Sequence, residues 1–302
     1  MTGDPTQLLQ PETTASRRAT TGFTRRRFLA GTGLALAGLT VYAAEISRHE
    51  LDLVHRDIHI ARLPEAFHGF RIAQLSDIHL EEFTEDAFLK YAVHRINALQ
   101  PDMVVLTGDY VSAGPRPYKF AFQAAARCGE LLRNLHCPLR YAILGNHDIN
   151  VNSQVVLEAL SSNGITTLVD QLVPIERHGQ RLWLSGLRDA GTGNPDLDRA
   201  VPTRLDAPLL ILCHEPDFAD TILRHPHASR ADLILSGHSH GGQVRLPFLP
   251  PLVLPPMGMK YVEGLFHLGQ TQLYVNRGLG TVGIPFRFDC PPEITAITLK
   301  PA

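Results

Sequence analysis

The chain has 302 residues, 44% of them hydrophobic, and a formal net charge of −2 at pH 7. This near-neutral balance gives no sign of nucleic-acid binding, which relies on clustered positive charge. The four cysteines, Cys128, Cys137, Cys213 and Cys290, include no C-x-x-C pair, so a zinc finger or dithiol redox motif has no support and a disulfide pairing cannot be assigned.

The first element in chain order is a basic and then apolar N-terminal segment. Residues 25–27 are arginines, Phe28 and Leu29 follow, and residues 30–44 are apolar, Gly-rich and uncharged. A basic region before a short apolar core is typical of an export signal, and paired arginines before Phe-Leu resemble a twin-arginine signal. We therefore assign residues 1–44 to a signal, with the twin-arginine machinery as a partner and a location outside the cytoplasmic membrane.

Three alternatives for this segment stay open. Cleavage before Ala44 fits the small residues at Val41-Tyr42-Ala43. An uncleaved anchor is the second, although the apolar stretch is shorter than the roughly 20 residues of a spanning helix. A cytoplasmic protein with a basic tail is the third, but the polar, turn-rich residues 1–22 are poorly suited to packing on a core. Cell wall, periplasm and membrane association remain equally open as destinations.

The rest of the chain, about 260 residues, is long enough for one domain with a sizeable core. Five short runs rich in Val, Ile and Leu are predicted as buried strands: residues 71–76, 103–107, 141–144, 209–212 and 233–235. Apolar residues at helical spacing predict helices over residues 84–99, 120–135 and 154–160. Residues 164–168 and 181–187 are expected in a second sheet, and residues 189–204 as a rim loop. This alternation predicts an α/β domain over residues 45–302.

Polar side chains directly follow each of the five predicted strands. They are Asp77, His79, Asp109, Asn146, His147, Asp148, His214, His238 and His240. Ligands of α/β proteins bind at the carboxyl ends of strands, so we expect these side chains to share one site. A mixed set of carboxylate, carboxamide and imidazole groups suits divalent transition ions, and a pair of such ions is typical of phosphate-ester hydrolysis.

The ordered blocks D-x-H, G-D, G-N-H-D, H and G-H-x-H resemble the calcineurin-like metallophosphoesterase superfamily. Residues 74–79, 237–243 and 276–280 are similar to exported bacterial phosphoesterases of the YkuE and YaeI type. The resemblance covers the chain from about residue 50 onward and implies two facing mixed β-sheets flanked by helices. Periodicity alone would give only α/β. It also implies a phosphodiesterase or phosphomonoesterase that uses metal-bound hydroxide for direct attack on phosphorus.

The resemblance further implies a role for each candidate residue. Asp109 would bridge two ions; Asp77, His79 and His240 would complete one shell, and Asn146, His214 and His238 the other. The metals would be Mn, Fe or Zn, and the ligand types do not choose among them.

His147 would contact the phosphoryl oxygen and act as a general acid toward the leaving group. Asp148 has two readings of equal weight, as the partner that orients His147 or as a turn or cap residue of the following helix. Arg277 is a candidate for binding the substrate phosphate, although an arginine more often forms a salt bridge. Gln243 and Asn276 could bind phosphate or hydrogen-bond to the imidazoles of the metal ligands.

The substrate is a phosphoester of unspecified type. A pyrophosphatase acting on a nucleotide-linked acyl sugar, or on another lipid-like envelope phosphate, is the alternative. A non-catalytic metal-binding envelope protein is a further alternative, against which the intact His147 argues. Residues 246–259, which are apolar and Pro-rich, are expected as a buried irregular connection. Contact with an acyl chain or, peripherally, with a membrane or the cell wall is the other reading of this stretch.

Overall fold

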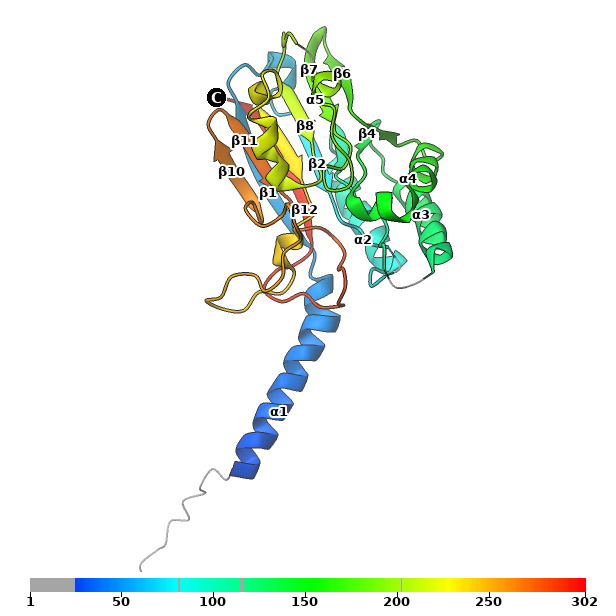
Figure 1. The fold of residues 1–302 in the computed structure, drawn as a ribbon, viewed down its shortest axis with the longest axis vertical. Coiled ribbons are helices and arrows are strands. Elements are labelled where there is room, and N and C mark those ends of the chain that lie inside the picture. The colour runs from blue at the N-terminus through cyan, green and yellow to red at the C-terminus, as the bar shows by residue number, and fades with distance from the viewer. Residues whose placement is uncertain (1–24, 81, 115–116, 202) are drawn as a thin grey trace, which may run out of the picture. The chain divides into compact units, whose positions relative to one another are not determined.

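The computed structural model describes residues 25–80, 82–114, 117–201 and 203–302 (Figure 1). The contacts divide the chain into residues 1–39 and residues 40–302, and each unit is described by itself. Helix α1 (Arg25–Val41), which lies in the first unit up to Leu39, has no buried side chain. The helical run Arg25–His49 has 25 residues and contains an 18-residue window with a mean hydropathy of 1.4, so by length and composition it could cross a membrane. This helical run is longer than residues 30–44, the apolar stretch identified in the sequence. Residues 1–24 of the assigned signal lie outside the described residues.

The second unit contains two six-stranded mixed sheets. The first has the order β1-β12-β2-β3-β4-β5: β1 (Asp52–Ile60), β12 (Glu293–Pro301), β2 (Arg71–Leu75), β3 (Met103–Leu106), β4 (Leu139–Ala142) and β5 (Thr166–Thr167). The second has the order β10-β11-β9-β8-β7-β6: β10 (Gly264–Leu268), β11 (Thr271–Val275), β9 (Leu233–Ser236), β8 (Leu209–Leu212), β7 (Gln180–Gly186) and β6 (Gln171–Arg177). The central strands of both sheets are parallel, and antiparallel pairs such as β12–β2 and β6–β7 make the sheets mixed.

Side chains alternate between three apolar layers, which explains why the central strands are apolar throughout. On β3, Val104 and Leu106 pack under helices α2 (Asp86–Leu99), α3 (Tyr118–Leu132) and α4 (Asn146–Ser161). Met103 and Val105 point the other way, into a layer shared with Leu210 and other residues of the second sheet. The far face of the second sheet packs on the short helices α5 (Leu197–Ala200) and α6 (Ala219–Ile222). A strand buried on both faces has no polar side to present.

The fold confirms the expectation of two facing mixed sheets flanked by helices, with two corrections. Residues 164–168 were expected in the second sheet, but β5 pairs in parallel with β4 of the first sheet. A helix between parallel strands returns the chain beside the strand it left, which places β5 next to β4. The helix expected over residues 154–160 begins at Asn146, with a kink at Asn152.

Candidate metal centre

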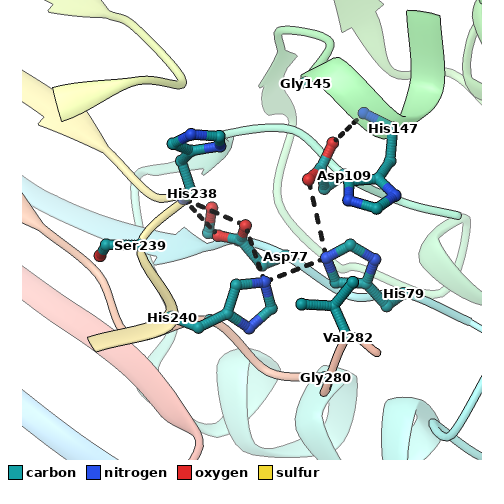
Figure 2. A network of polar contacts seen from close by, with 12 residues as sticks. Asp77, His79, Asp109, Gly145, His147, His238, Ser239, His240, Gly280 and Val282 are labelled. Carbon is teal, nitrogen blue, oxygen red and sulfur yellow. Dashed lines mark hydrogen bonds and ion pairs between the residues drawn. The ribbon is translucent and has the colours of Figure 1, made fainter. Parts of the chain in front are cut away.

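The candidate residues lie after the carboxyl ends of strands from both sheets. Figure 2 shows six of them close together: Asp77, His79, Asp109, His147, His238 and His240. Asp77 and His79 follow β2, Asp109 follows β3, His214 follows β8, and His238 and His240 follow β9. Asn146 and His147 form the first turn of α4, directly after β4. All except Asn146 and His147 are buried.

The backbone around these side chains is unusual. Asp77, His79, Asp109, His238 and His240 all have positive φ, between 48° and 71°. Residues other than glycine rarely adopt this left-handed conformation, and such residues cluster at functional sites. The sharp turns bring the side chains of both sheets into one space.

One cluster consists of Asp77, His79 and His240, whose ligand atoms lie within 4.8 Å of one another. The Nε2 atoms of His79 and His240 are 3.1 Å apart, and His240 Nε2 is 3.4 Å from Asp77 Oδ1. Burial and the neighbouring His147 lower the pKa of His79 to about 3, and burial also lowers the pKa of His240 well below its usual value. Two neutral imidazoles facing a carboxylate could together hold a divalent cation.

A second cluster consists of Asp109, His214 and His238, also within 4.8 Å of one another. His214 Nδ1 lies 2.7 Å from the Thr107 carbonyl and His238 Nε2 lies 2.8 Å from the Pro256 carbonyl, so each of these nitrogens donates a proton. The opposite nitrogen of each neutral ring is then free to bind a metal, an arrangement typical of metal-ligating histidines. Although burial disfavours the imidazolium, Asp109 raises the pKa of His214 well above its usual value. A proton on His214 and a cation are therefore alternative counter-charges for Asp109.

Asp109 lies between the two clusters. Its Oδ2 atom is 3.6 Å from His79 Nε2 and 3.3 Å from His214 Nε2, while Oδ1 accepts the backbone N–H of His147 at 2.9 Å. A carboxylate in this position could bridge two ions.

Two buried polar atoms of this donor set make no hydrogen bond within the described part of the chain, although His214 Nε2 lies 3.3 Å from Asp109 Oδ2. Asn146 Oδ1 and His214 Nε2 are buried and have no hydrogen-bond partner among the described residues. An unpaired buried polar atom costs about 1–3 kcal/mol, so such atoms call for an explanation. Coordination of a cation would satisfy both.

His147 is half-buried and stands edge-on to His79, with ring centroids 4.8 Å apart. Its Nδ1 atom accepts the Ala113 backbone N–H at 2.9 Å. The neutral ring therefore carries its proton on Nε2, which makes this atom a hydrogen-bond donor.

Asp148 is completely buried and binds backbone rather than His147. Its Oδ2 atom accepts the N–H groups of Asp109 at 2.8 Å and Gly145 at 3.0 Å, and its Oδ1 accepts that of Tyr110 at 2.9 Å. These bonds tie the loop after β3 to the N-terminus of α4. The geometry favours the cap reading over the orienting one.

Three residues suggested as phosphate contacts have other partners. Arg277 pairs with Glu293 at 2.6 Å and Asp52 at 2.7 Å, so its guanidinium is already neutralised. Gln243 donates to the carbonyls of residues 282 and 284 and accepts the N–H of residue 282. Asn276 donates to Thr295 and accepts the Gly278 N–H. These side chains shape the loops around the site.

Arg287 is a structural residue that the sequence pattern did not suggest. Its guanidinium is fully buried and donates to the carbonyls of Arg277, Gly278 and Cys290, at 2.9 to 3.1 Å. The Arg277 and Gly278 carbonyls belong to the turn after β11, where Gly278 lies against Asp77, and the Cys290 carbonyl lies just before β12. A single arginine outside any motif carries no sequence signal for such a role.

A cavity of about 400 Å³ adjoins the two clusters. Polar lining comes from Asp109, Asn146, His147, His238 and His240. An apolar wall stands beside them, made of Val244, Leu252, Val253, Pro255, Val282 and Ile284. Residues 246–259 were expected to be buried, but Leu252 and Val253 are exposed, as are Phe248, Leu249 and Met259. Frequent prolines prevent the regular structure that would fold this stretch onto the core.

Two mixed sheets with Asp, Asn and His side chains at facing strand ends define a metallophosphoesterase, a metal-dependent hydrolase acting on phosphoester bonds. Residues 70–242 match the family model for calcineurin-like phosphoesterases, and the chain belongs to this family.

Three relatives show the range of the family around this chain. The metallophosphoesterase YkuE of Bacillus subtilis (strain 168) is 37% identical over 91% of this chain and 97% of its own length. Phosphodiesterase YaeI of Escherichia coli (strain K12) is 30% identical over 91% of this chain and 98% of its own. The UDP-2,3-diacylglucosamine pyrophosphatase LpxG of Chlamydia muridarum (strain MoPn / Nigg) is 31% identical over 77% of this chain and 85% of its own.

Proposed function

We propose that the protein hydrolyses phosphodiesters or phosphomonoesters at a pair of divalent cations. Asp77, His79 and His240 would hold one cation, and Asn146, His214 and His238 the other. Asp109 would be shared. The position of Asp109 Oδ2 between the two clusters is the single observation that carries this proposal. Mn, Fe and Zn all suit these donors.

The bound pair would supply Lewis acidity and an activated water for attack on phosphorus. His147 would donate from Nε2 to a phosphoryl or leaving-group oxygen, because Ala113 occupies Nδ1. A donor or acid at this position contributes about 10² to 10⁴ in rate. Asp148 would act through the backbone, by holding Asp109 and the start of α4 in register.

A second candidate activity is pyrophosphate hydrolysis on a nucleotide-linked acyl sugar or another lipid-like envelope phosphate. The apolar wall beside the site favours this activity, because a purely polar phosphoester has no apolar group to pack against such a surface. The name of the relative LpxG supports the same substrate class.

We also infer export by the twin-arginine route, supported by residues 25–27 before Phe28 and Leu29 and by the apolar helix that follows. Joint replacement Arg25→Lys and Arg26→Lys should leave the protein in the cytoplasm of a host with this pathway. Normal export of that variant would rule the route out.

The test of the activity is turnover of bis-p-nitrophenyl phosphate with added Mn²⁺, measured together with metal content. His147→Ala should keep both metals and lose about 10² to 10⁴ in kcat. Asp109→Ala should lose metal as well, while His267→Ala, at an exposed strand position, should change neither. Full turnover of His147→Ala would remove the donor role. A metal-loaded wild type inert toward every phosphoester would leave the non-catalytic alternative.

A further inference from the structure

Residues 246–259, called the apolar loop here, form an exposed hydrophobic surface. Phe248 is 106% exposed, Val253 78%, Leu252 59% and Leu249 56%. The loop contains no charged residue. In Figure 1 the gold segment at this point of the chain projects away from the strands of both sheets. Clustered exposed apolar side chains mark surfaces that contact another apolar phase.

Phe248 contributes nothing evident to folding. Its φ is 66°, a left-handed conformation that is unfavourable for an aromatic residue, and its side chain has no buried surface to offset that cost. Stability alone would favour Asn or Gly here. A contact outside the protein explains the aromatic side chain.

The apolar surface of the loop continues into the candidate metal centre. Leu252 and Val253 are exposed on the loop and also line the cavity, as do Asn146 and His147. Val282 and Ile284 extend the same wall. A phosphate at the metal centre would therefore have its substituent against hydrocarbon, on a path that leads out to the loop.

The end of the N-terminal helical run packs against Arg287 and Phe288. The Ala43 carbonyl accepts the Arg287 N–H at 3.1 Å, and the Tyr42 ring stands edge-on to Phe288 at 6.5 Å. Arg287 and Phe288 lie just after Ile284 in the chain. Further along, Arg48 binds Glu85 at 2.8 Å. Residues 42–48 thus pack on the same unit that holds the cavity.

We propose that the apolar loop inserts into a lipid bilayer and that the site cleaves phosphoesters carried by membrane lipids. This inference rests on the proposed phosphoesterase function. The occupant is lipid because the loop is apolar and uncharged, the wall connects it to the phosphate site, and the same chain carries a helix long and apolar enough to span a membrane. Docking without basic residues depends on hydrocarbon burial, so it should be insensitive to salt.

Insertion is testable by site-directed labelling, because all four native cysteines are buried. Leu249→Cys in the full-length, metal-loaded protein would carry nitrobenzoxadiazole, and Tyr118→Cys on α3 is a matched control with 53% exposure against 56%. With phosphatidylcholine vesicles, the label at position 249 should shift to the blue and be quenched by brominated lipid, and the control should not. An unchanged spectrum at position 249 would overturn the proposal.

Turnover separates this inference from the proposed function. The substrates are p-nitrophenyl hexadecyl phosphate in phosphatidylcholine vesicles and p-nitrophenyl methyl phosphate in solution. Phe248→Asn with Leu249→Ser, both outside the cavity lining, should lose roughly tenfold or more on the vesicle substrate and stay within about twofold on the soluble one. Tyr91→Ser with Tyr118→Ser should change neither. If the double variant lost activity equally on both substrates, or on neither, membrane docking would be overturned. The proposed function would still stand as long as the wild type hydrolysed the soluble ester. A wild type inert toward both would instead overturn the function.

Discussion

Gly145→Ala adds one methyl group in the middle of the candidate metal centre. Gly145 is the N-cap of α4, with φ −104° and ψ 178°, a conformation that alanine adopts without strain. The new Cβ would lie 2.3 Å from Asp109 Oδ1 and 2.7 Å from His214 Cε1 and Nε2. The glycine is therefore needed for space, and the two side chains that limit the space are proposed ligands.

The size of the effect follows from these distances. Ordinary contact begins at 3.4 Å, so the Asp109 carboxylate must retreat by about 1 Å. A displacement of about 1 Å at a reacting centre can cost about 10² in rate. Overpacking costs roughly 1–3 kcal/mol of folding stability, which a protein of this size can tolerate.

Metal content, kcat on a chromogenic phosphodiester and the Tm with and without Mn²⁺ would be measured on the Gly145→Ala variant. Metal content and kcat should both fall, and the rise in Tm on adding Mn²⁺ should shrink. Gly114→Ala is the matched control, because its Cβ would meet nothing closer than Glu82 Oε1 at 3.7 Å. A Gly145→Ala variant with full metal content and wild-type kcat would refute the placement of Asp109 and His214.

Three further outcomes are expected. Asp148→Asn should lower metal affinity about 10- to 100-fold, because an amide N–H would face the backbone N–H groups of Asp109 and Gly145. The pH profile of kcat should not move. Normal affinity on metal titration would contradict this prediction. Arg277→Met should cost about 2–4 kcal/mol in denaturant unfolding by leaving buried Glu293 unpaired, yet keep kcat/KM; a large rise in KM would restore the phosphate-clamp role. Mn²⁺ affinity should fall as pH drops below about 6, because burial raises the pKa of Asp77 to about 6 and a proton then competes with the metal; a flat calorimetric profile from pH 5 to 7 would exclude Asp77 as a ligand.

The strands and the convergence of polar residues could be predicted because both depend on local pattern. Continuous apolar runs indicate strands buried on two faces, and parallel strands bring their carboxyl ends to one edge. Asp77 follows β2 of the first sheet and His214 follows β8 of the second, so their meeting also requires that the two sheets face each other, which only the family resemblance implied.

The rest depends on tertiary contacts with no local signal. β12 lies between β1 and β2, pairing parallel to one and antiparallel to the other, and nothing in residues 293–301 specifies those partners. The partners of Asp148 are backbone N–H groups, which no side-chain motif encodes. The apolar loop was expected to be buried because hydrophobic residues usually are, and its exposure is the departure that points to lipid.

Shared coordination by Asp109 is tested most directly by loading the protein with Mn²⁺, counting bound ions and recording the electron paramagnetic resonance spectrum. Two bound ions per chain with the signature of a spin-coupled pair are expected, and Asp109→Asn should abolish the coupling. A wild-type protein that saturates with one magnetically isolated ion would contradict the dinuclear centre.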